Sequence, residues 1–191
     1  MENFRHHISQ LIDISEIEWN SIKEVTVQEY FNAKETILDV GKIAKNIYFI
    51  KKGLIRSFYL LNGQEINTYF ACDNQFISSY ASFIAQQPSL EQLEAIVKTE
   101  VLSIPYEKLN ALYKQHPKLE KLGRIIAEKN YLCVVDRTLS MQTKTAKEKY
   151  LEFIDKYDFK IINNVPQHQI ATFLGIAPES LSRVRKQLST S

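Results

Sequence analysis

The stretch "IATFLGIAPESLSRVRKQL", from Ile170 to Leu188, restricts the fold of this chain more than any other part of the sequence. Two helices that cross steeply through a short turn need a small residue where their backbones approach, and a glycine that can become left-handed where the first helix ends. Ala171 and Gly175 meet these needs, and Pro178 suits the first turn of the second helix, where its missing N–H is no loss. The apolar residues, with Gln167 as the first position, are Ile170, Leu174, Ile176, Leu181, Val184 and Leu188. The sequence therefore predicts a helix-turn-helix.

The second of these predicted helices has one polar face. At about 100° per residue, Leu181, Val184 and Leu188 point one way. The opposite face carries Glu179, Ser182, Arg183 and Lys186, with Ser180 on a flank. Arginine can bond guanine through two hydrogen bonds, glutamate can accept one from cytosine N4, and lysine or serine can reach phosphate. A merely solvated amphipathic helix would carry a similar number of charges, so that alternative stays open, but the spacing and the glycine favour a helix that enters a DNA groove.

The basic residues are concentrated towards the C-terminus, although the whole chain has a formal net charge of only +2. Residues 140–191 contain eight Lys or Arg against five Asp or Glu, whereas residues 1–139 contain 16 against 17. The attraction for nucleic acid is therefore expected at the C-terminal end. Gln167 and His168 lie there, at the start of the first predicted helix, where His168 either contacts a phosphate or is simply exposed.

Several functional classes lack support in the sequence. No run of 18 apolar residues exists, and the start "MENFRHHISQ" lacks the apolar stretch of a signal peptide, so a cytoplasmic protein without membrane contact is expected. Cys72 and Cys133 lie far apart without a CxxC pattern, and both are interpreted as buried small side chains. The four histidines fall outside the segment predicted to be β-structure, and no P-loop, nucleophile elbow or HExxH motif occurs. We therefore expect no enzyme, no metal site and no cofactor.

The middle of the chain predicts a β-sandwich or roll. From about Asn32 to Pro105, short alternating runs such as "IYFIKKG" and "QLEAIVKTEVLSIP" are separated by turn residues. Asn62-Gly63 lies between two such runs and is a strong hairpin signal, because a type I′ turn needs positive φ at both positions. Residues 1–30 instead have a rough amphipathic helical spacing.

A long helical segment follows, from Tyr106 to about Leu139, with a break at Pro117. Leu119, Leu122, Ile126 and Cys133 recur near a 3-4 spacing within it. This stripe either packs onto the chain's own β-structure or pairs with its copy in a homodimer, and we favour the homodimer because the other elements already supply two core layers. Residues 140–191 form the last unit, in which "FKIINNVP" is a helix, a short strand or a loop ahead of the helix-turn-helix.

With these segments in place, nearly the whole chain resembles the catabolite activator/fumarate-nitrate regulator (Crp/Fnr) family of bacterial transcription factors. "IYFIKKGLIRSFYLLNGQE" is similar to the family's strand-turn-strand and glycine hairpin, with Gly53 and Arg56 in the expected places. "EVLSIPYEKLNALYKQHPKL" is similar to the end of the roll and the start of the dimer helix, and "HQIATFLGIAPESLSRVRKQL" to the helix-turn-helix. The resemblance implies an α+β fold: an N-terminal cyclic-nucleotide-binding-like β-roll (a double-stranded β-helix or jelly roll), a long dimerisation helix and a C-terminal winged helix-turn-helix.

The same resemblance implies base contacts for Glu179 and Arg183 and a backbone contact for Ser180. It also implies a homodimer on a palindromic double-stranded operator, with RNA polymerase as a further partner. The position before the glutamate is often an arginine that reads a base in the activator branch, but here it is Pro178. A different operator sequence is therefore expected.

The sensor pocket departs further from the cyclic-AMP-binding members, which carry a Gly-Glu pair for the ribose and an Arg-Ser/Thr pair for the phosphate. Ser78 and Ser79, followed by Tyr80, occupy the Gly-Glu region here, and Ser89 lies roughly where the arginine would be. No Lys or Arg occurs between Arg56 and Lys98, so a buried phosphate would lack a partner unless Arg124 or Arg137 enters from the long helix. The effector is therefore predicted to be absent or to be a less charged molecule than cyclic AMP.

These patterns together predict two units: a sensor domain at 1–139 whose dimerisation helix spans about 106–139, and a DNA-binding domain at 140–191. The predicted function is that of a homodimeric, sequence-specific transcription regulator with the Glu179–Leu188 helix in the major groove. The alternative is a degenerate sensor or protein-interaction module that has lost operator recognition.

Overall fold

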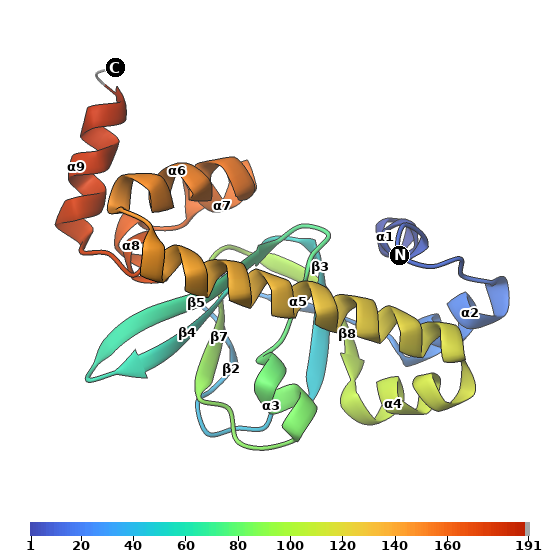
Figure 1. Ribbon diagram of the computed structural model, residues 1–191. Coiled ribbons are helices and arrows are strands. Elements are labelled where there is room, and N and C mark those ends of the chain that lie inside the picture. Colours follow the sequence, from blue (N-terminus) through green and yellow to red (C-terminus); the bar gives the residue numbers. More distant parts are fainter. Residues whose placement is uncertain (190–191) are drawn as a thin grey trace.

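A computed structural model describes residues 1–189 and places a β-roll between two groups of helices (Figure 1). The first group begins with α1 (Glu2–Ser9) and α2 (Glu16–Val25). Ser15 starts α2 through a capping box, in which its hydroxyl accepts from the Glu18 amide and the Glu18 carboxylate accepts from the Ser15 amide. The helical spacing expected through residue 30 ends earlier, because Val27 already pairs with Ser103 as the start of a strand.

Two four-stranded antiparallel sheets form the roll. The first has the order β1 (Val27–Phe31), β8 (Thr99–Pro105), β3 (Asn46–Lys52) and β6 (Phe76–Ile77). The second has the order β2 (Thr36–Leu38), β7 (Glu91–Ala95), β4 (Leu54–Leu61) and β5 (Gln64–Cys72). Ile50, Ile55, Ala71 and Val101 are fully buried between the sheets. The predicted hairpin is confirmed: Asn62 and Gly63 join β4 to β5, and both have positive φ.

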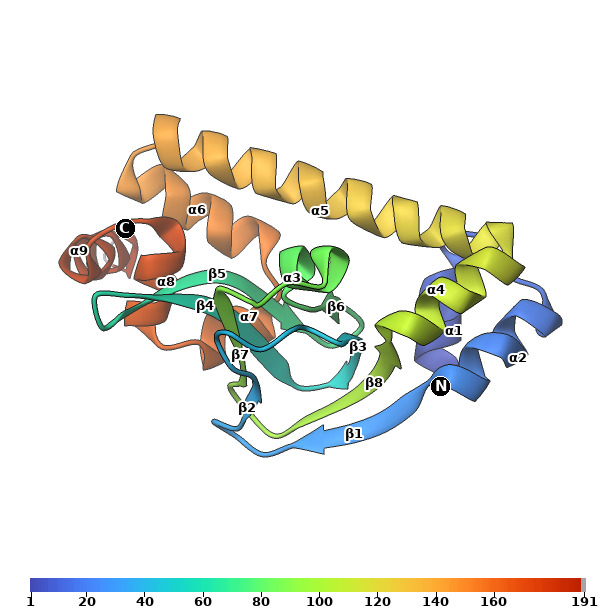
Figure 2. The ribbon, with the colours of Figure 1, turned by 90° about the horizontal axis from the view of Figure 1, so that it is seen from below.

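The long helical segment is present and breaks where expected. After the short α3 (Tyr80–Ala85), α4 (Tyr106–Gln115) ends at His116, and α5 (Pro117–Thr143) starts with its proline at the first helical position. α5 continues past the expected end at Leu139 and lies across the length of the roll (Figure 2).

The stripe identified on this helix from its 3-4 spacing faces the chain's own domain, so assigning it to a dimer seam was wrong. Leu119 and Leu122 are buried in a core with Phe4, Trp19 and Phe49, and Ile126 packs against the same core. Cys133 lines cavities beside the helix but is exposed, so the burial expected for it was wrong, whereas Cys72 is buried as expected. The N-terminal helices supply an additional layer that this stripe covers, which its periodicity could not reveal.

Beyond α5, the elements of residues 144–189 are all helices: α6 (Ala146–Lys156), α7 (Phe159–Asn164), α8 (Gln167–Leu174) and α9 (Pro178–Ser189). Within this range no strand forms the expected wing. "FKIINNVP" is the helix α7, because the Asp158 carboxylate accepts from the Lys160 amide and caps its first turn. Thr145 and Glu148 start α6 through a second capping box.

The C-terminal helices share one apolar core with the roll. Leu54, Phe70 and Cys72 of β4 and β5 lie in the same cluster as Phe153 of α6 and Phe173 of α8. Across this junction the Phe70 and Phe173 rings are 5.2 Å apart between centroids. The position of the helix-turn-helix is therefore coupled to the hairpin strands of the roll by direct packing.

Candidate nucleic-acid interface and ligand cavity

The two helices α8 and α9 form the predicted helix-turn-helix. Gly175 ends α8 in the left-handed conformation with φ 62°, and its amide donates to the Thr172 carbonyl at 3.2 Å. A side chain at this position would also approach Met141, because an added Cβ would lie 2.8 Å from its Cε atom. Leu181 and Val184 of α9 are buried against α6 and α8. Burial of this stripe fixes which face of α9 remains outside.

The residues predicted to read DNA lie on that outer surface. Glu179, Ser182, Arg183 and Lys186 are exposed, and Ser180 is half-buried on the flank. Gln167 and His168 are exposed in the first turn of α8. Figure 1 shows α9 projecting away from the roll at the C-terminal end of the molecule.

Two charged side chains on this surface have no interaction partner in the described part of the chain. Within residues 1–189, neither the Glu179 carboxylate nor the Arg183 guanidinium makes an ion pair or a side-chain hydrogen bond. Arg185, which the sequence reasoning did not single out, lies half-buried with its guanidinium 5.9 Å from the centre of the Tyr150 ring. It anchors α9 to α6 by a cation–π contact. Its neighbour Arg183 is left available on the outside.

Two cavities lie beside α5, with volumes of about 490 Å³ and about 610 Å³. The larger one separates the helix from the roll. The larger cavity is lined by strands β4 and β5, by α3, by α5 and by two residues of the C-terminal helices, Tyr157 and Phe173. Ser78 and Tyr80, both predicted to be pocket residues, line it. Ser78 also donates to the Asn46 carbonyl at 2.9 Å.

The other three predicted pocket residues lie outside this lining. Ser79 and Ser89 are buried, and their hydroxyls hydrogen-bond to each other at 2.8 Å. Ser89 also donates to the Glu91 carbonyl, which holds the loop before β7. Arg124 was misplaced: it lies on the outer face of α5 and pairs with Glu128 one turn later, at 2.6 Å, because its position on the helix turns it away from the roll.

Arg137 is the cation that enters from α5. Its guanidinium donates to the carbonyls of Asn67 and Thr68 in β5 and to the Phe173 carbonyl in α8. The same group lies 4.4 Å from the centre of the Phe173 ring. Burial lowers the pKa of Arg137, and no carboxylate in the described part of the chain hydrogen-bonds to it. Arg137 therefore joins the long helix, the roll and the helix-turn-helix at one point.

Residues 28–116 match the family described as the cyclic nucleotide-binding domain. Among solved structures, FixK2 from Bradyrhizobium japonicum is similar, with a TM-score of 0.76 and 20% identity over 87% of this chain and 85% of that one. A protein assigned to the Crp/Fnr family of transcriptional regulators from Eubacterium rectale gives a TM-score of 0.71 at 18% identity, covering 93% and 85% of the two chains. The chain has the Crp/Fnr fold.

Catabolite activator protein from Thermus thermophilus has the same architecture, with a TM-score of 0.54 and 18% identity over 93% of this chain and 85% of that one. The search of curated proteins found no match. The resemblance proposed from the sequence is thus confirmed for the roll, the long helix and the helical C-terminal unit of the Crp/Fnr fold. In the described part of the chain, no helix is long and apolar enough to cross a membrane.

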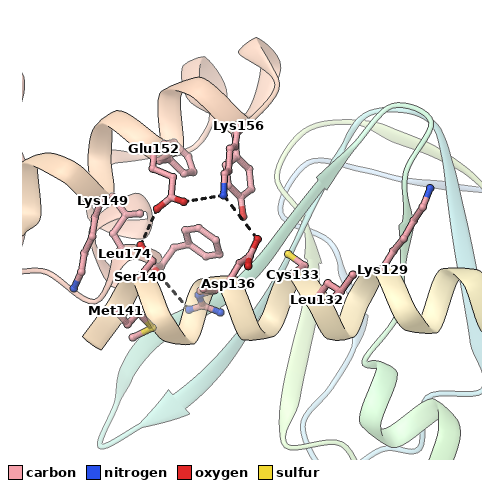
Figure 3. Close-up of a pocket in the computed structure, with 14 residues that line it drawn as sticks. Lys129, Leu132, Cys133, Asp136, Ser140, Met141, Lys149, Glu152, Lys156 and Leu174 are labelled. Atoms are coloured by element: carbon pink, nitrogen blue, oxygen red, sulfur yellow. Dashed lines mark hydrogen bonds and ion pairs between the residues drawn. The ribbon is translucent and has the colours of Figure 1, made fainter. Parts of the chain in front are cut away.

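The second cavity lies between α5 and α6, where the long helix joins the C-terminal unit (Figure 3). Glu152 of α6 points towards the end of α5 and accepts hydrogen bonds from Ser140 at 2.8 Å and from Lys144 and Lys156 at 2.7 Å. Lys156 also lies 3.9 Å from the Asp136 carboxylate. Hydrogen bonds from Lys144 and Lys156 lower the pKa of Glu152 to about 2. One carboxylate therefore fixes the angle between α5 and α6.

Glu152→Gln is expected to remove a pH-dependent part of the stability, about 1–2 kcal/mol above pH 5. The folded-state pKa lies below the ordinary value of 4.5, so the contribution is complete above that value and is lost as pH falls towards about 2. Urea unfolding between pH 2 and 6 should therefore give a flatter profile for the variant. The control is Glu24→Gln, at an exposed glutamate without a described hydrogen bond. Identical profiles for Glu152→Gln and the wild type would contradict the assignment.

Proposed function

We propose that this chain is a homodimeric, sequence-specific DNA-binding transcription regulator of the Crp/Fnr type. The observation that carries the proposal is the exposed, unpaired Glu179 and Arg183 on the second helix of a helix-turn-helix. Both groups are free to meet base edges, where arginine suits guanine and glutamate suits cytosine. Ser180, Ser182, Lys186, Gln167 and His168 surround them and are assigned to the phosphate backbone or to neighbouring bases.

Dimerisation is supported by a second apolar stripe on α5. Leu132, Val135 and Leu139 follow a 3-4 spacing, and Leu132 and Leu139 are 60% and 53% exposed. Tyr131 and Val134 are exposed beside them. A helix of 27 residues with leucines at this spacing is suited to pairing with a copy of itself in a coiled coil. Two copies of α9 would then read a pseudo-palindrome with half-sites about 34 Å apart.

In the proposed organisation, residues 1–139 form the sensor and residues 140–191 the DNA-binding unit. We also propose that the chain is not an enzyme and that it binds RNA polymerase. Both parts of the proposal rest on analogy with regulators of the same fold. The second candidate is a module that binds a protein and no longer recognises an operator. The free Glu179 and Arg183 favour the regulator.

The test is selection of bound DNA from a random duplex pool by the purified protein. Recovery of a palindrome whose half-sites are one helical turn apart would support the regulator and identify its operator. Recovery of DNA without any common sequence, both with the apo protein and with cell extract of small molecules added, would favour the protein-interaction module. The salt dependence of affinity for the recovered DNA gives the number of phosphate contacts.

Arg183→Ala should reduce discrimination at one base pair of each half-site by about 1–3 kcal/mol, since it removes a two-hydrogen-bond contact to guanine. Affinities for the selected operator and for all single substitutions in one half-site would measure this. Arg5→Ala is the control, because Arg5 pairs with Glu16 in the N-terminal helices, far from α9 in Figure 1. An equal loss of affinity on all sequences would instead make Arg183 a phosphate contact.

A further inference from the structure

The second cavity, between α5 and α6, is bounded by one face of each helix (Figure 3). Lys149, Glu152 and Lys156 line it from α6 at intervals of three and four residues, which places them on one side of that helix. On α5 the lining residues recur at the same spacing between Lys129 and Ser140. Lys149, Glu152 and Lys156 do not line the space between the roll and α5, so the two cavities can be tested separately.

Positive charge exceeds negative charge around this second cavity. Its lining contains four cations and two carboxylates, which are Lys129, Arg137, Lys149, Lys156, Asp136 and Glu152. Glu152 already accepts hydrogen bonds from Lys156 and from Lys144, which lies outside the lining. Asp136 lies 3.9 Å from the same Lys156 ammonium. The other three cations of the lining therefore have no carboxylate partner within residues 1–189.

Lys149 is the cation that most needs an anion. It is only 8% exposed, and its ammonium makes no hydrogen bond or ion pair with any residue that the structure describes. Lysine is rarely buried to this extent without a partner, because a buried ammonium loses much of its hydration. The buried Nε of Arg137 likewise lacks a hydrogen-bond partner in the described part of the chain. Two buried cationic side chains on facing helices thus have unused donors.

The remaining walls of this cavity are apolar. They include Leu132, Met141, Phe153, Phe173 and Leu174. Phe153 and Phe173 are buried, and their ring centroids are 5.9 Å apart. The volume of about 490 Å³ is in the range of sites for small organic molecules. An inorganic anion would leave these walls without contact, whereas an organic anion with an apolar body would meet both the cations and the walls.

We propose that the cavity between α5 and α6 binds a small organic anion with an apolar body, such as an aromatic carboxylate or sulfonate. The anionic group pairs with the Lys149 ammonium, and the body lies against the apolar walls. Figure 3 shows Lys129 at the opposite end of the cavity from Lys149, where it adds attraction for an anion. The proposal does not depend on the proposed function, because binding here requires neither DNA nor a dimer.

The first experiment uses two fluorescent probes that differ by one charge. 8-Anilino-1-naphthalenesulfonate is an anion, and N-phenyl-1-naphthylamine is the same ring system without the sulfonate. The sulfonate should bind saturably to the full chain, at least tenfold more tightly than the uncharged probe, because only the sulfonate gives Lys149 a partner. Equal or tighter binding of the uncharged probe would overturn the proposal.

Replacing Lys149 locates the probe. Lys149→Met keeps an unbranched apolar stem and removes the charge, so it should weaken the sulfonate at least tenfold and the uncharged probe less than twofold. Lys147→Met, at an exposed lysine of α6 outside the lining, is the matched control and should bind normally. Lys129→Gln, at an exposed lysine of the lining, should weaken the sulfonate at least threefold and keeps the test valid if Lys149→Met fails to fold.

One further variant separates the two cavities beside α5. Ala127 lines only the cavity between the roll and α5, so Ala127→Phe should leave the affinity for the sulfonate unchanged. Loss of sulfonate binding in Ala127→Phe, together with normal binding in Lys149→Met, would place the probe in the other cavity and overturn the proposal. Unchanged sulfonate binding in both Lys149→Met and Lys129→Gln would also overturn it.

Discussion

Leu132→Glu combined with Leu139→Glu is expected to convert the dimer into a monomer. The two positions lie one heptad apart on the exposed face of α5, so a dimer would bring four carboxylates together along its apolar seam. Burying unpaired charges costs several kcal/mol, more than such a seam can offset. Affinity for a full palindrome should then fall by about 10²–10⁴, because each half-site is bound independently. Sedimentation velocity gives the mass, and operator titration gives the affinity.

A matched control separates loss of the seam from general damage. Leu90 is 73% exposed in the loop before β7, so Leu90→Glu makes the same chemical change away from α5. It should remain dimeric and bind normally, and far-ultraviolet circular dichroism should show native helix content in both variants. A double variant that stays dimeric would exclude this face of α5 as the seam.

The helix-turn-helix could be predicted from the sequence because its determinants are local. Gly175 needs left-handed backbone, Pro178 begins a helix, and the apolar residues recur within 22 positions, 167–188. The Asn62-Gly63 hairpin and the break at Pro117 were predictable for the same reason. In each case a few neighbouring residues have strong backbone preferences that the rest of the fold does not oppose.

Which face of α5 packs against the chain's own core could not be predicted in the same way, because this helix has apolar residues on more than one face. Leu122 and Ile126 pack on the N-terminal helices, whereas Leu132 and Leu139 remain exposed. Periodicity identifies apolar stripes, but it does not say which stripe meets the chain's own core. That choice depended on α1 and α2 covering one end of the roll, which is a tertiary arrangement.

The cavity was only partly predictable, because its lining comes from segments far apart in the chain. Ser78 and Tyr80 were found through their place in a family motif, and Arg137 was one of two candidate cations on the helix. Tyr69 and Tyr157 had no local signal, since a tyrosine in a strand or at a helix end is equally suited to a core. Only the packing of α5 over the roll brings them to one space.

Phe173→Ala should have the largest effect on stability, a loss of about 3–5 kcal/mol in the free energy of unfolding. Phe173 is 3% exposed, and its ring contacts Phe70 of the roll, Phe153 and Tyr157 of the C-terminal helices, and the Arg137 guanidinium. Its removal leaves a void at the junction of the roll and the helix-turn-helix. Urea unfolding measured by tyrosine fluorescence and circular dichroism gives the difference.

Phe159→Ala makes the same substitution at a side chain that is 78% exposed on α7, and it should change the free energy of unfolding by less than about 0.5 kcal/mol. The comparison also tests whether the two parts unfold as one. Because Phe70 and Phe173 share a core, Phe173→Ala should lower one common transition if coupling is strong. Two separate transitions, with only the first one shifted, would mean that the C-terminal helices unfold independently of the roll. The packing between α8 and β5 would then be too weak to couple the helix-turn-helix to the roll.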